Sequence, residues 1–161
     1  MVRHKARWLL VKFENEESVK GISCEKIKKE NMDEKKTPLN RKDIYHAIRE
    51  VTEEAFGVAA AGIIQDIEVR MYNHDTNLAM IKVPRDHCDL VRSALMLMVD
   101  IKDSPTVARV VSTNGSARTA KLHAFKEIKR IFRAKNKNRT HIKECDMYNL
   151  EEQFEQVRNV E

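Results

Sequence analysis

The sequence predicts an α+β fold in which two helices cover one face of an antiparallel sheet. Three observations favour this class. Residues 7–13 place Leu9, Val11 and Phe13 on one face, residues 106–113 are rich in β-branched side chains, and two apolar stripes at helical spacing flank a hairpin between them. The order β-α-β-β-α-β is that of the ferredoxin-like or RRM-like fold, and an additional basic C-terminal helix follows it.

The composition is that of one highly charged domain. Of 161 residues, 42 % are apolar, enough for a modest core, and 30 Lys and Arg stand against 25 Asp and Glu. The charge is uneven, because residues 144–161 carry −5, which leaves +10 for residues 1–143. A basic body of this kind indicates an anionic partner, nucleic acid or a membrane surface.

Cysteine usage and hydropathy argue against secreted and membrane-spanning proteins. Cys24, Cys88 and Cys145 are odd in number and far apart, so we expect no disulfide framework and an intracellular protein. The apolar run at residues 8–11 is too short for a secretory signal. No segment approaches the roughly 20 apolar residues of a membrane span.

The first strand is predicted at residues 7–13, and a variable charged insertion follows over residues 14–38. Asn40 and Asp43 form a capping-box pair that begins the first helix, and Gly57 ends it. The apolar stripe of this helix consists of Ile44, Ala47, Ile48, Val51 and Ala55.

A hairpin and a second helix come next. We expect a connection at residues 59–62, strands at 63–72 and 78–83, and a loop at 73–77 between the strands. Asp86 offers an N-cap for the second helix. The apolar stripe of that helix consists of Leu90, Val91, Ala94, Leu95 and Met98.

The third helix, predicted at about residues 115–133, has two unlike sides. At 100° per residue an apolar arc adjoins a cationic arc, with Leu122 and Lys121 as exceptions. We assign residues 1–134 to one RRM-like domain and residues 135–161 to a basic, then acidic, tail that is partly helical or disordered. The cationic arc contains Arg118, Lys126, Lys129, Arg130 and Arg133.

This basic helix and the N-terminus are the clearest functional signal. Lys and Arg along a phosphate backbone gain affinity by releasing condensed counterions. Ten bases stand against Glu127 alone over residues 118–143, and Arg3, Lys5 and Arg7 add charge at the N-terminus. The alternatives are a solvated amphipathic helix and docking onto an acidic protein.

The second face of the sheet also needs a cover. Residues 78–83 are apolar on both faces, whereas the first two helices cover only one of them. We expect the third helix and a partner subunit to share the other face, and the Met-rich run 95–98 to offer an adaptable surface. The expected protein-interface residues are Trp8, Leu10, Leu78, Met80 and Met96.

The candidates for catalysis are poor. His87, Cys88 and Asp89 are adjacent, but neighbours on a helix do not face one another, so we interpret them as packing and capping residues. His74 and Asp75 fall in the hairpin loop, where a turn role is favoured over metal ligation. There is no glycine-rich phosphate loop and no HExxH motif, so we expect no catalytic residue, metal or cofactor on the protein.

Four short motifs occur in order. Residues 1–10 combine a basic triplet with Trp-Leu-Leu, residues 69–76 contain Val-Arg-Met-Tyr-Asn and a Thr, residues 85–95 contain an Arg, Asp-Leu-Val and Ala-Leu, and residues 111–119 end in Gly-Ser-Ala-Arg-Thr. Together they resemble the ribonuclease P/MRP protein subunit family called processing-of-precursors subunit five. The last motif is similar to its Ser-Gly-Thr-Ile-Arg turn, although Thr113-Asn114 is inserted and Ser-Ala replaces Thr-Ile.

The resemblance implies a non-catalytic, RNA-binding subunit of a ribonucleoprotein endonuclease. Such a particle removes the 5′ leader of precursor tRNA, and its MRP relative processes ribosomal RNA. The protein would stabilise the catalytic RNA, which would hold the Mg²⁺. The implied partners are the ribonuclease P/MRP RNA, precursor tRNA, a TIM-barrel-like protein subunit and a small RRM-like paralogous subunit, with no membrane. The implied location is the nucleus and nucleolus.

The expected RNA contacts fall into two groups. Motif match and charge together predict Arg3, Lys5, Arg7, Arg85 and Arg118, and charge alone predicts Lys121, Lys126, Lys129, Arg130 and Arg133. Two rival functions remain open. A free-standing RRM-like module would bind single-stranded RNA and stack bases on Trp8. A small enzyme of acylphosphatase-like shape would need a phosphate-cradling loop.

Overall fold

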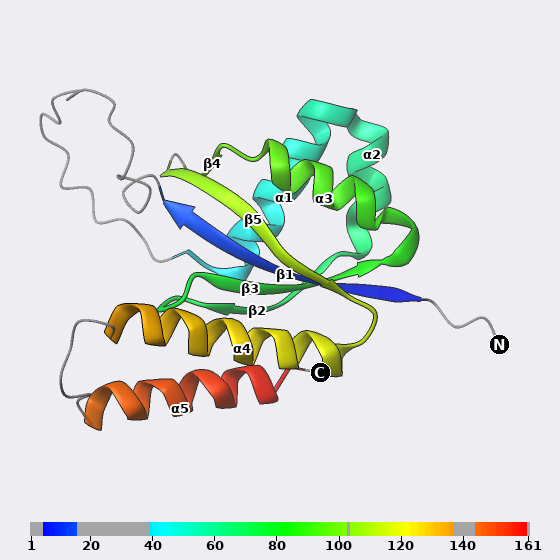
Figure 1. Ribbon diagram of the computed structural model, residues 1–161. Coiled ribbons are helices and arrows are strands. Elements are labelled where there is room, and N and C mark those ends of the chain that lie inside the picture. Colours follow the sequence, from blue (N-terminus) through cyan, green and yellow to red (C-terminus); the bar gives the residue numbers. More distant parts are fainter. Residues whose placement is uncertain (1–4, 16–38, 103, 137–143, 161) are drawn as a thin grey trace, which may run out of the picture.

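The computed structural model describes residues 5–15, 39–102, 104–136 and 144–160. Strands within these ranges form a five-stranded antiparallel sheet in the order β2-β3-β1-β5-β4 (Figure 1). β1 and β3 lie inside the sheet, which confirms the predicted α+β, ferredoxin-like class. The strands are β1 (Ala6–Asn15), β2 (Glu68–Asn73), β3 (Leu78–Pro84), β4 (Asp100–Ile101) and β5 (Ser104–Asn114).

Pairing of β1 brings three chain segments to one end of the sheet. Ala6, at the start of β1, lies opposite Pro84, at the end of β3. Trp8 lies opposite Asn114, the last residue of β5. The segments that leave β3 and β5 therefore begin beside the N-terminal residues of β1, although they are far apart in sequence.

Two helices cover one face of the sheet, as predicted. They are α1 (Arg41–Phe56) and α3 (Cys88–Leu97). The capping box of α1 is present: the Asn40 backbone N–H donates to Asp43 Oδ2 at 2.8 Å, and Lys102 Nζ contacts the same oxygen at 2.8 Å. The hydrogen bond from Lys102 is the main cause that lowers the pKa of Asp43. The core under these helices includes Leu9, Val11, Phe13, Ile44, Ile48, Val91 and Leu95.

The expected connection at residues 59–62 and the start of the expected strand at residue 63 are wrong. This segment is helical, forming α2 (Val58–Ile63) and the short 3-10 helix η2 (Ile64–Asp66). Alanine favours helix, and Ile64 and Ile67, three residues apart, are both buried, which is helical rather than strand spacing. Gly57 separates α1 from α2 with a φ of 86°, a conformation that favours glycine.

The prediction that Asp86 caps the second helix is also wrong. Asp86 lies inside the 3-10 helix η3 (Arg85–His87), and α3 begins after His87 with no side-chain cap. The turn of η3 continues directly into α3, so no residue is left in the extended conformation that an N-cap side chain requires.

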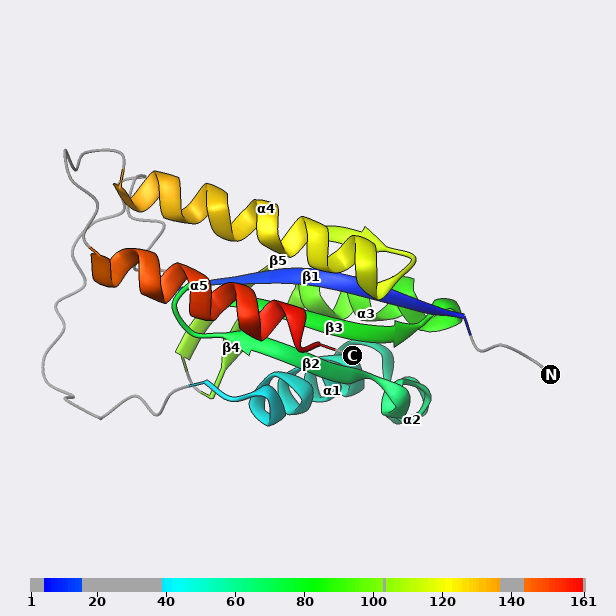
Figure 2. The same cartoon turned by 90° about the horizontal axis from the view of Figure 1, so that it is seen from below.

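Two long helices cover the opposite face of the sheet. Figures 1 and 2 show α4 (Ala117–Asn136) and α5 (Glu144–Arg158) lying side by side below it, across from α1, α2 and α3. They enclose a second core with the sheet. Its fully or nearly fully buried members are Trp8, Leu10, Met71, Leu78, Met80, Ala120, Ala124, Ile128, Val157 and Val160.

Polar contacts join α5 to the hairpin between β2 and β3. Asn73 Nδ2 donates to Gln156 Oε1 at 2.9 Å, and Gln153 Nε2 donates to Asp75 Oδ2 at 3.0 Å. The Asn73 carbonyl oxygen of the side chain also accepts from the backbone N–H groups of Asp75 and Thr76, each at 3.0 Å. Asn73 and Thr76 are buried, so this network fixes the position of α5 against the hairpin.

Candidate nucleic-acid interface

Four predicted RNA contacts, Lys5, Arg7, Arg85 and Arg118, gather where the start of β1, the end of β3 and the start of α4 meet. The Arg85 backbone N–H donates to the Lys5 carbonyl at 2.8 Å, and Arg7 lies opposite Val83 in the sheet. Arg118 belongs to the first turn of α4. We call these four residues the basic end. Arg3 falls outside the described residues.

The turn from β5 into α4 holds Arg7 close. A side-chain carbon at Gly115 would lie 3.0 Å from Arg7 Nη1, so the guanidinium occupies the space that this glycine leaves open. Ser116 Oγ accepts from the Thr119 backbone N–H at 3.3 Å and caps the helix. The glycine-serine pair thus lets β1 and α4 place Arg7 and Arg118 at the same end of the molecule.

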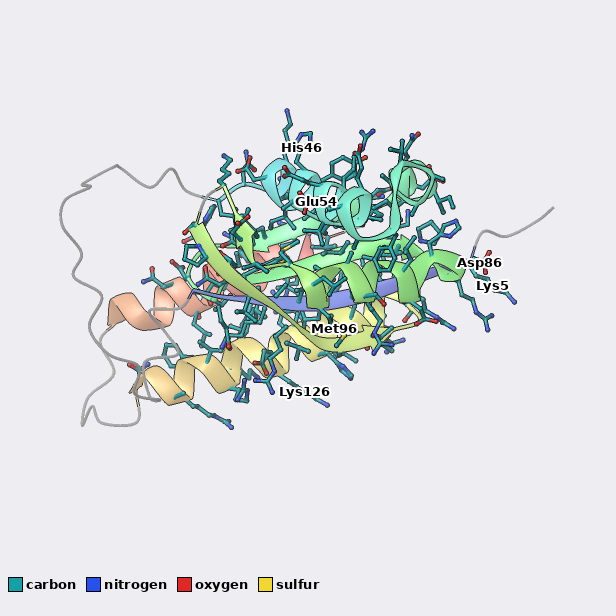
Figure 3. All side chains as sticks on the ribbon, turned by 90° about the horizontal axis from the view of Figure 1, so that it is seen from above. Lys5, His46, Glu54, Asp86, Met96 and Lys126 are labelled. Carbon is teal, nitrogen blue, oxygen red and sulfur yellow. The ribbon has the colours of Figure 1, made fainter. Side chains whose placement is uncertain are left out.

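The outward face of α4 continues the positive charge along the molecule. Lys126 and Arg133 are exposed there, and Figure 3 shows Lys126 projecting from the helix away from the sheet. Leu122 lies on this face and is 51 % exposed. Both exceptions to the predicted arcs are therefore explained: Leu122 lies among the cations, and Lys121 lies beside α5.

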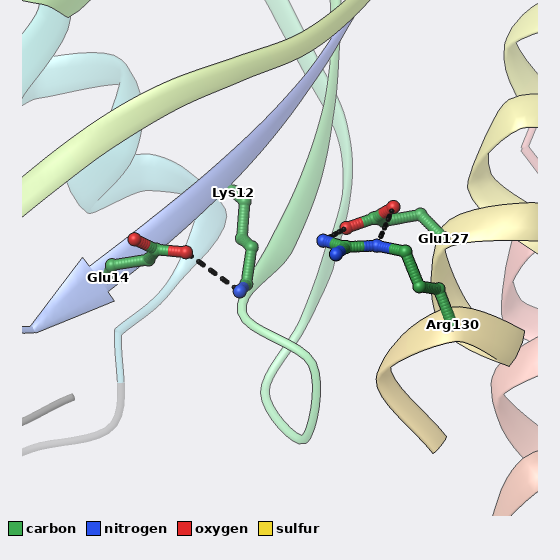
Figure 4. Close-up of polar contacts among 4 residues, drawn as sticks. All are labelled: Lys12, Glu14, Glu127 and Arg130. Carbon is green, nitrogen blue, oxygen red and sulfur yellow. Dashed lines mark hydrogen bonds and ion pairs between the residues drawn. The ribbon is translucent and has the colours of Figure 1, made fainter. Parts of the chain in front are cut away.

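Three of the cations predicted on α4 are engaged within the chain. Lys121 Nζ donates to the Arg158 carbonyl at 2.8 Å, near the end of α5. Lys129 Nζ lies 5.6 Å from the centre of the Phe154 ring. Arg130 Nε donates to Glu127 Oε2 at 2.9 Å (Figure 4). The first two contacts join α5 to α4, whereas the Arg130–Glu127 contact lies within α4.

Glu127 is an anion enclosed by cations. Its side chain faces β1 and β5, and the residue is only 8 % exposed. The hydrogen bond from Arg130 lowers the pKa of Glu127 most, the charges of Lys12 and Arg109 lower it further, and burial opposes them. Lys12 itself pairs with Glu14, two residues further along β1, at 2.8 Å (Figure 4). The cost of burying this carboxylate is thus offset by nearby positive charge.

Four of the five expected protein-interface residues are unavailable to a partner. Trp8, Leu10, Leu78 and Met80 lie in the second core, where Trp8 is 7 % exposed and the other three are fully buried. The expectation of a shared cover is corrected here, because α4 and α5 of the same chain cover these residues. Met96 is different, since it is 79 % exposed on α3.

Further exposed apolar residues lie outside the predicted interface. Leu97 and Val99 follow Met96, and Phe56, Val58 and Ile63 lie around α2. On β5, Val107 and Val111 are exposed beside α4. Alternation in residues 106–113 indicates a strand with one open face, but the sequence does not tell which face α4 leaves uncovered.

The residues considered for catalysis do not form a reactive site. Cys88 is buried, and desolvation with the nearby Asp89 charge raises the pKa of its thiol, which disfavours the nucleophilic thiolate. In the described ranges, no group of three or more His, Cys, Asp or Glu could hold a metal ion. No helix of those ranges is long and apolar enough to cross a membrane.

Comparison with known proteins agrees with the motifs. The chain is 25 % identical to "Ribonuclease P/MRP protein subunit POP5" of Schizosaccharomyces pombe over 130 residues, which are 80 % of this chain and 89 % of that protein. A chain in the cryo-EM structure of yeast ribonuclease MRP aligns with 98 % of this chain and 95 % of its own, at 10 % identity and a TM-score of 0.47. The Rpp14/Pop5 family matches residues 7–125, and the chain therefore belongs to the Rpp14/Pop5 family.

Proposed function

We propose that this chain is a non-catalytic, RNA-binding protein subunit of the ribonuclease P and MRP ribonucleoproteins. The observation that carries the proposal is the basic end. Lys5, Arg7, Arg85 and Arg118 come from three separate parts of a chain of the Rpp14/Pop5 family and lie together at one end of its sheet. The fission yeast relative is named as a ribonuclease P/MRP subunit, which supports the same particle.

The physical role follows from charge. RNA helices that pack closely repel one another through their phosphates, and a fixed set of cations lowers that repulsion by displacing condensed counterions. The basic end and the outward face of α4 would act in this way. In this proposal the RNA holds the Mg²⁺ and performs the cleavage that removes the 5′ leader of precursor tRNA or processes ribosomal RNA.

Different surfaces of the chain would bind different partners. RNA would contact the cationic surfaces, whereas Met96, Leu97 and Val99 are exposed apolar side chains suited to a protein. We propose a TIM-barrel-like subunit and a small RRM-like paralogue as the protein partners. The proposed location is the nucleus and nucleolus, where such particles would process their RNA substrates.

The second core argues against the rival function, a free-standing module that binds single-stranded RNA. An RRM-like module would stack bases on the open face of its sheet, but α4 and α5 cover that face, and Trp8 is 7 % exposed. RNA can reach the basic end and the outer face of α4 without moving either helix. The acylphosphatase-like rival has no support from Cys88, which is buried with a raised pKa.

The salt dependence of RNA binding tests the proposal. We expect the double variant Arg85→Ala/Arg118→Ala, assembled with the ribonuclease P RNA and partner subunits, to bind more weakly. The slope of log affinity against log salt should become shallower by about 2, one for each lost phosphate contact. The measurement is a binding titration of the RNA over a series of salt concentrations.

A matched variant separates this effect from a general loss of charge. Lys42 and Arg49 are exposed on α1, on the opposite side of the sheet from α4. Lys42→Ala/Arg49→Ala removes the same two charges and should leave the slope unchanged. Equal slopes for the two double variants would contradict the proposal.

A further inference from the structure

A polar groove lies next to the basic end. It has a volume of about 960 Å³, within the usual range of small-molecule sites. The start of β1, η2, the start of β2, the end of β3 and η3 form its walls. The groove is lined by Lys5, Ala6, Gln65, Asp66, Glu68, Lys82, Pro84, Arg85, Asp86 and His87. The groove shares Lys5 and Arg85 with the basic end. An RNA strand bound at the basic end therefore lies at the entrance of the groove.

The groove presents charges of both signs. Lys82 pairs with Glu68 at 3.4 Å. Among the described residues, no ion pair or side-chain hydrogen bond engages Lys5, Asp66 or Asp86, and all three are exposed. Figure 3 shows Lys5 and Asp86 side by side at the end of the molecule. Cationic donors and anionic acceptors are therefore both available to a ligand.

This combination restricts the ligand chemistry. A phosphate chain alone would meet the carboxylates of Asp66 and Asp86 and be repelled by them. A nucleotide carries both required groups: its phosphate is an anion for Lys5 and Arg85, and its base can donate hydrogen bonds. The Watson–Crick edge of guanine has two adjacent N–H donors, which match the two oxygens of a carboxylate. That edge is free only when the base is unpaired.

We propose that the groove binds one unpaired guanosine of the RNA. Lys5 and Arg85 hold its phosphate, and Asp66 or Asp86 accepts hydrogen bonds from its base. The inference rests on the proposed RNA-binding function and adds base recognition to it. The basic end then binds RNA without regard to sequence, whereas the groove selects one base.

Short RNAs that differ at one position test the inference. The probes are an oligouridine, the same oligouridine with one central guanosine, and one with a central inosine, which lacks the 2-amino donor. We expect the full-length protein to bind the guanosine probe roughly tenfold more tightly than the oligouridine, with the inosine probe between them. Fluorescence anisotropy measures the three affinities.

Two pairs of variants identify the groups responsible. Asp66→Asn/Asp86→Asn should abolish the preference for guanosine. Glu50→Gln/Glu54→Gln removes two exposed carboxylates from α1 and should keep the preference, although the change in charge is the same. A guanosine preference that persists in the Asp variant would overturn the inference.

The remaining outcomes separate the two proposals. Salt-dependent binding of all three probes with equal affinity would leave the basic end as an RNA site and reject the groove as a base site. If the Asp variant then weakened assembly with protein subunits instead, the groove would be a protein contact. Absence of salt-dependent binding to any probe, by the chain alone and by the assembled particle, would contradict the proposed RNA-binding function itself.

Discussion

Glu127 shows how one buried side chain organises the charge of α4. Its carboxylate accepts two hydrogen bonds from the Arg130 guanidinium and faces the cations of β1 and β5. Arg130 is therefore held against the helix, and its charge is neutralised locally by Glu127 rather than left free for an anionic partner. The predicted cationic arc is correct in its members, but the sequence does not reveal which of them bind to an acid of their own helix.

The pH dependence of stability tests the state of Glu127. Because its pKa in the folded protein lies below the ordinary value of 4.5, ionised Glu127 stabilises the fold above that pH, and the contribution is lost as the pH falls through the folded pKa. We expect Glu127→Gln to lower the free energy of unfolding by about 1 kcal/mol at neutral pH. The deficit should shrink as the pH falls below 4.5, as measured by urea unfolding.

An exposed glutamate provides the comparison for that measurement. Glu53→Gln on α1 should change the free energy of unfolding by less than about 0.5 kcal/mol at neutral pH. A deficit for Glu127→Gln that stays constant from neutral to acidic pH would show that packing, rather than the ionised carboxylate, causes it.

At the scale of elements, α5 together with α4 covers the face of the sheet that α1 and α3 leave open. Val157 and Val160 enter the second core, Phe154 packs edge to face against Phe125 with ring centres 5.2 Å apart, and Asn73 binds Gln156. The helix also lies along α4, where Lys121 Nζ donates to the Arg158 carbonyl. Under the proposed function, RNA would therefore contact the basic end and the outer side of α4.

A core substitution in α5 measures how much this cover stabilises the domain. Val157 is fully buried, so Val157→Ala should lower the free energy of unfolding by about 2 kcal/mol, through lost burial and the cavity it leaves. Glu151→Ala, at an exposed position of the same helix, should have little effect. Urea denaturation checks both variants. Equal stability of Val157→Ala and the wild type would mean that α5 is a loosely attached tail.

The elements differ in how far local sequence determines their structure. α1 was predicted because its cap and its apolar stripe lie within one segment of chain. The connection predicted at residues 59–62 and the strand start predicted at residue 63 are wrong, because a short apolar run such as Ile63 and Ile64 fits both a strand and the buried side of a helix. The sequence alone could not show that α5 covers the second face of the sheet, because the contacts between α5 and β2 join segments far apart in the chain.

At the scale of the whole molecule, the sheet topology determines where charge accumulates. Lys5 and Arg85 are 80 residues apart in the sequence, yet a backbone hydrogen bond joins them. The sequence could predict these cations by type and motif, but their convergence follows only from the pairing of β1 with β3 and β5. The groove was not predicted, because its carboxylates and cations come from three distant stretches of the chain and match no local motif.

The identity of the RNA bound in cells tests the central claim most directly. A tagged full-length chain would be purified from its own cells, and the RNA that accompanies it would be sequenced. Our account predicts strong enrichment of the ribonuclease P and MRP RNAs, reduced for Arg85→Ala/Arg118→Ala but not for Lys42→Ala/Arg49→Ala. Recovery of the folded protein without either RNA, or with unrelated short single strands only, would contradict it.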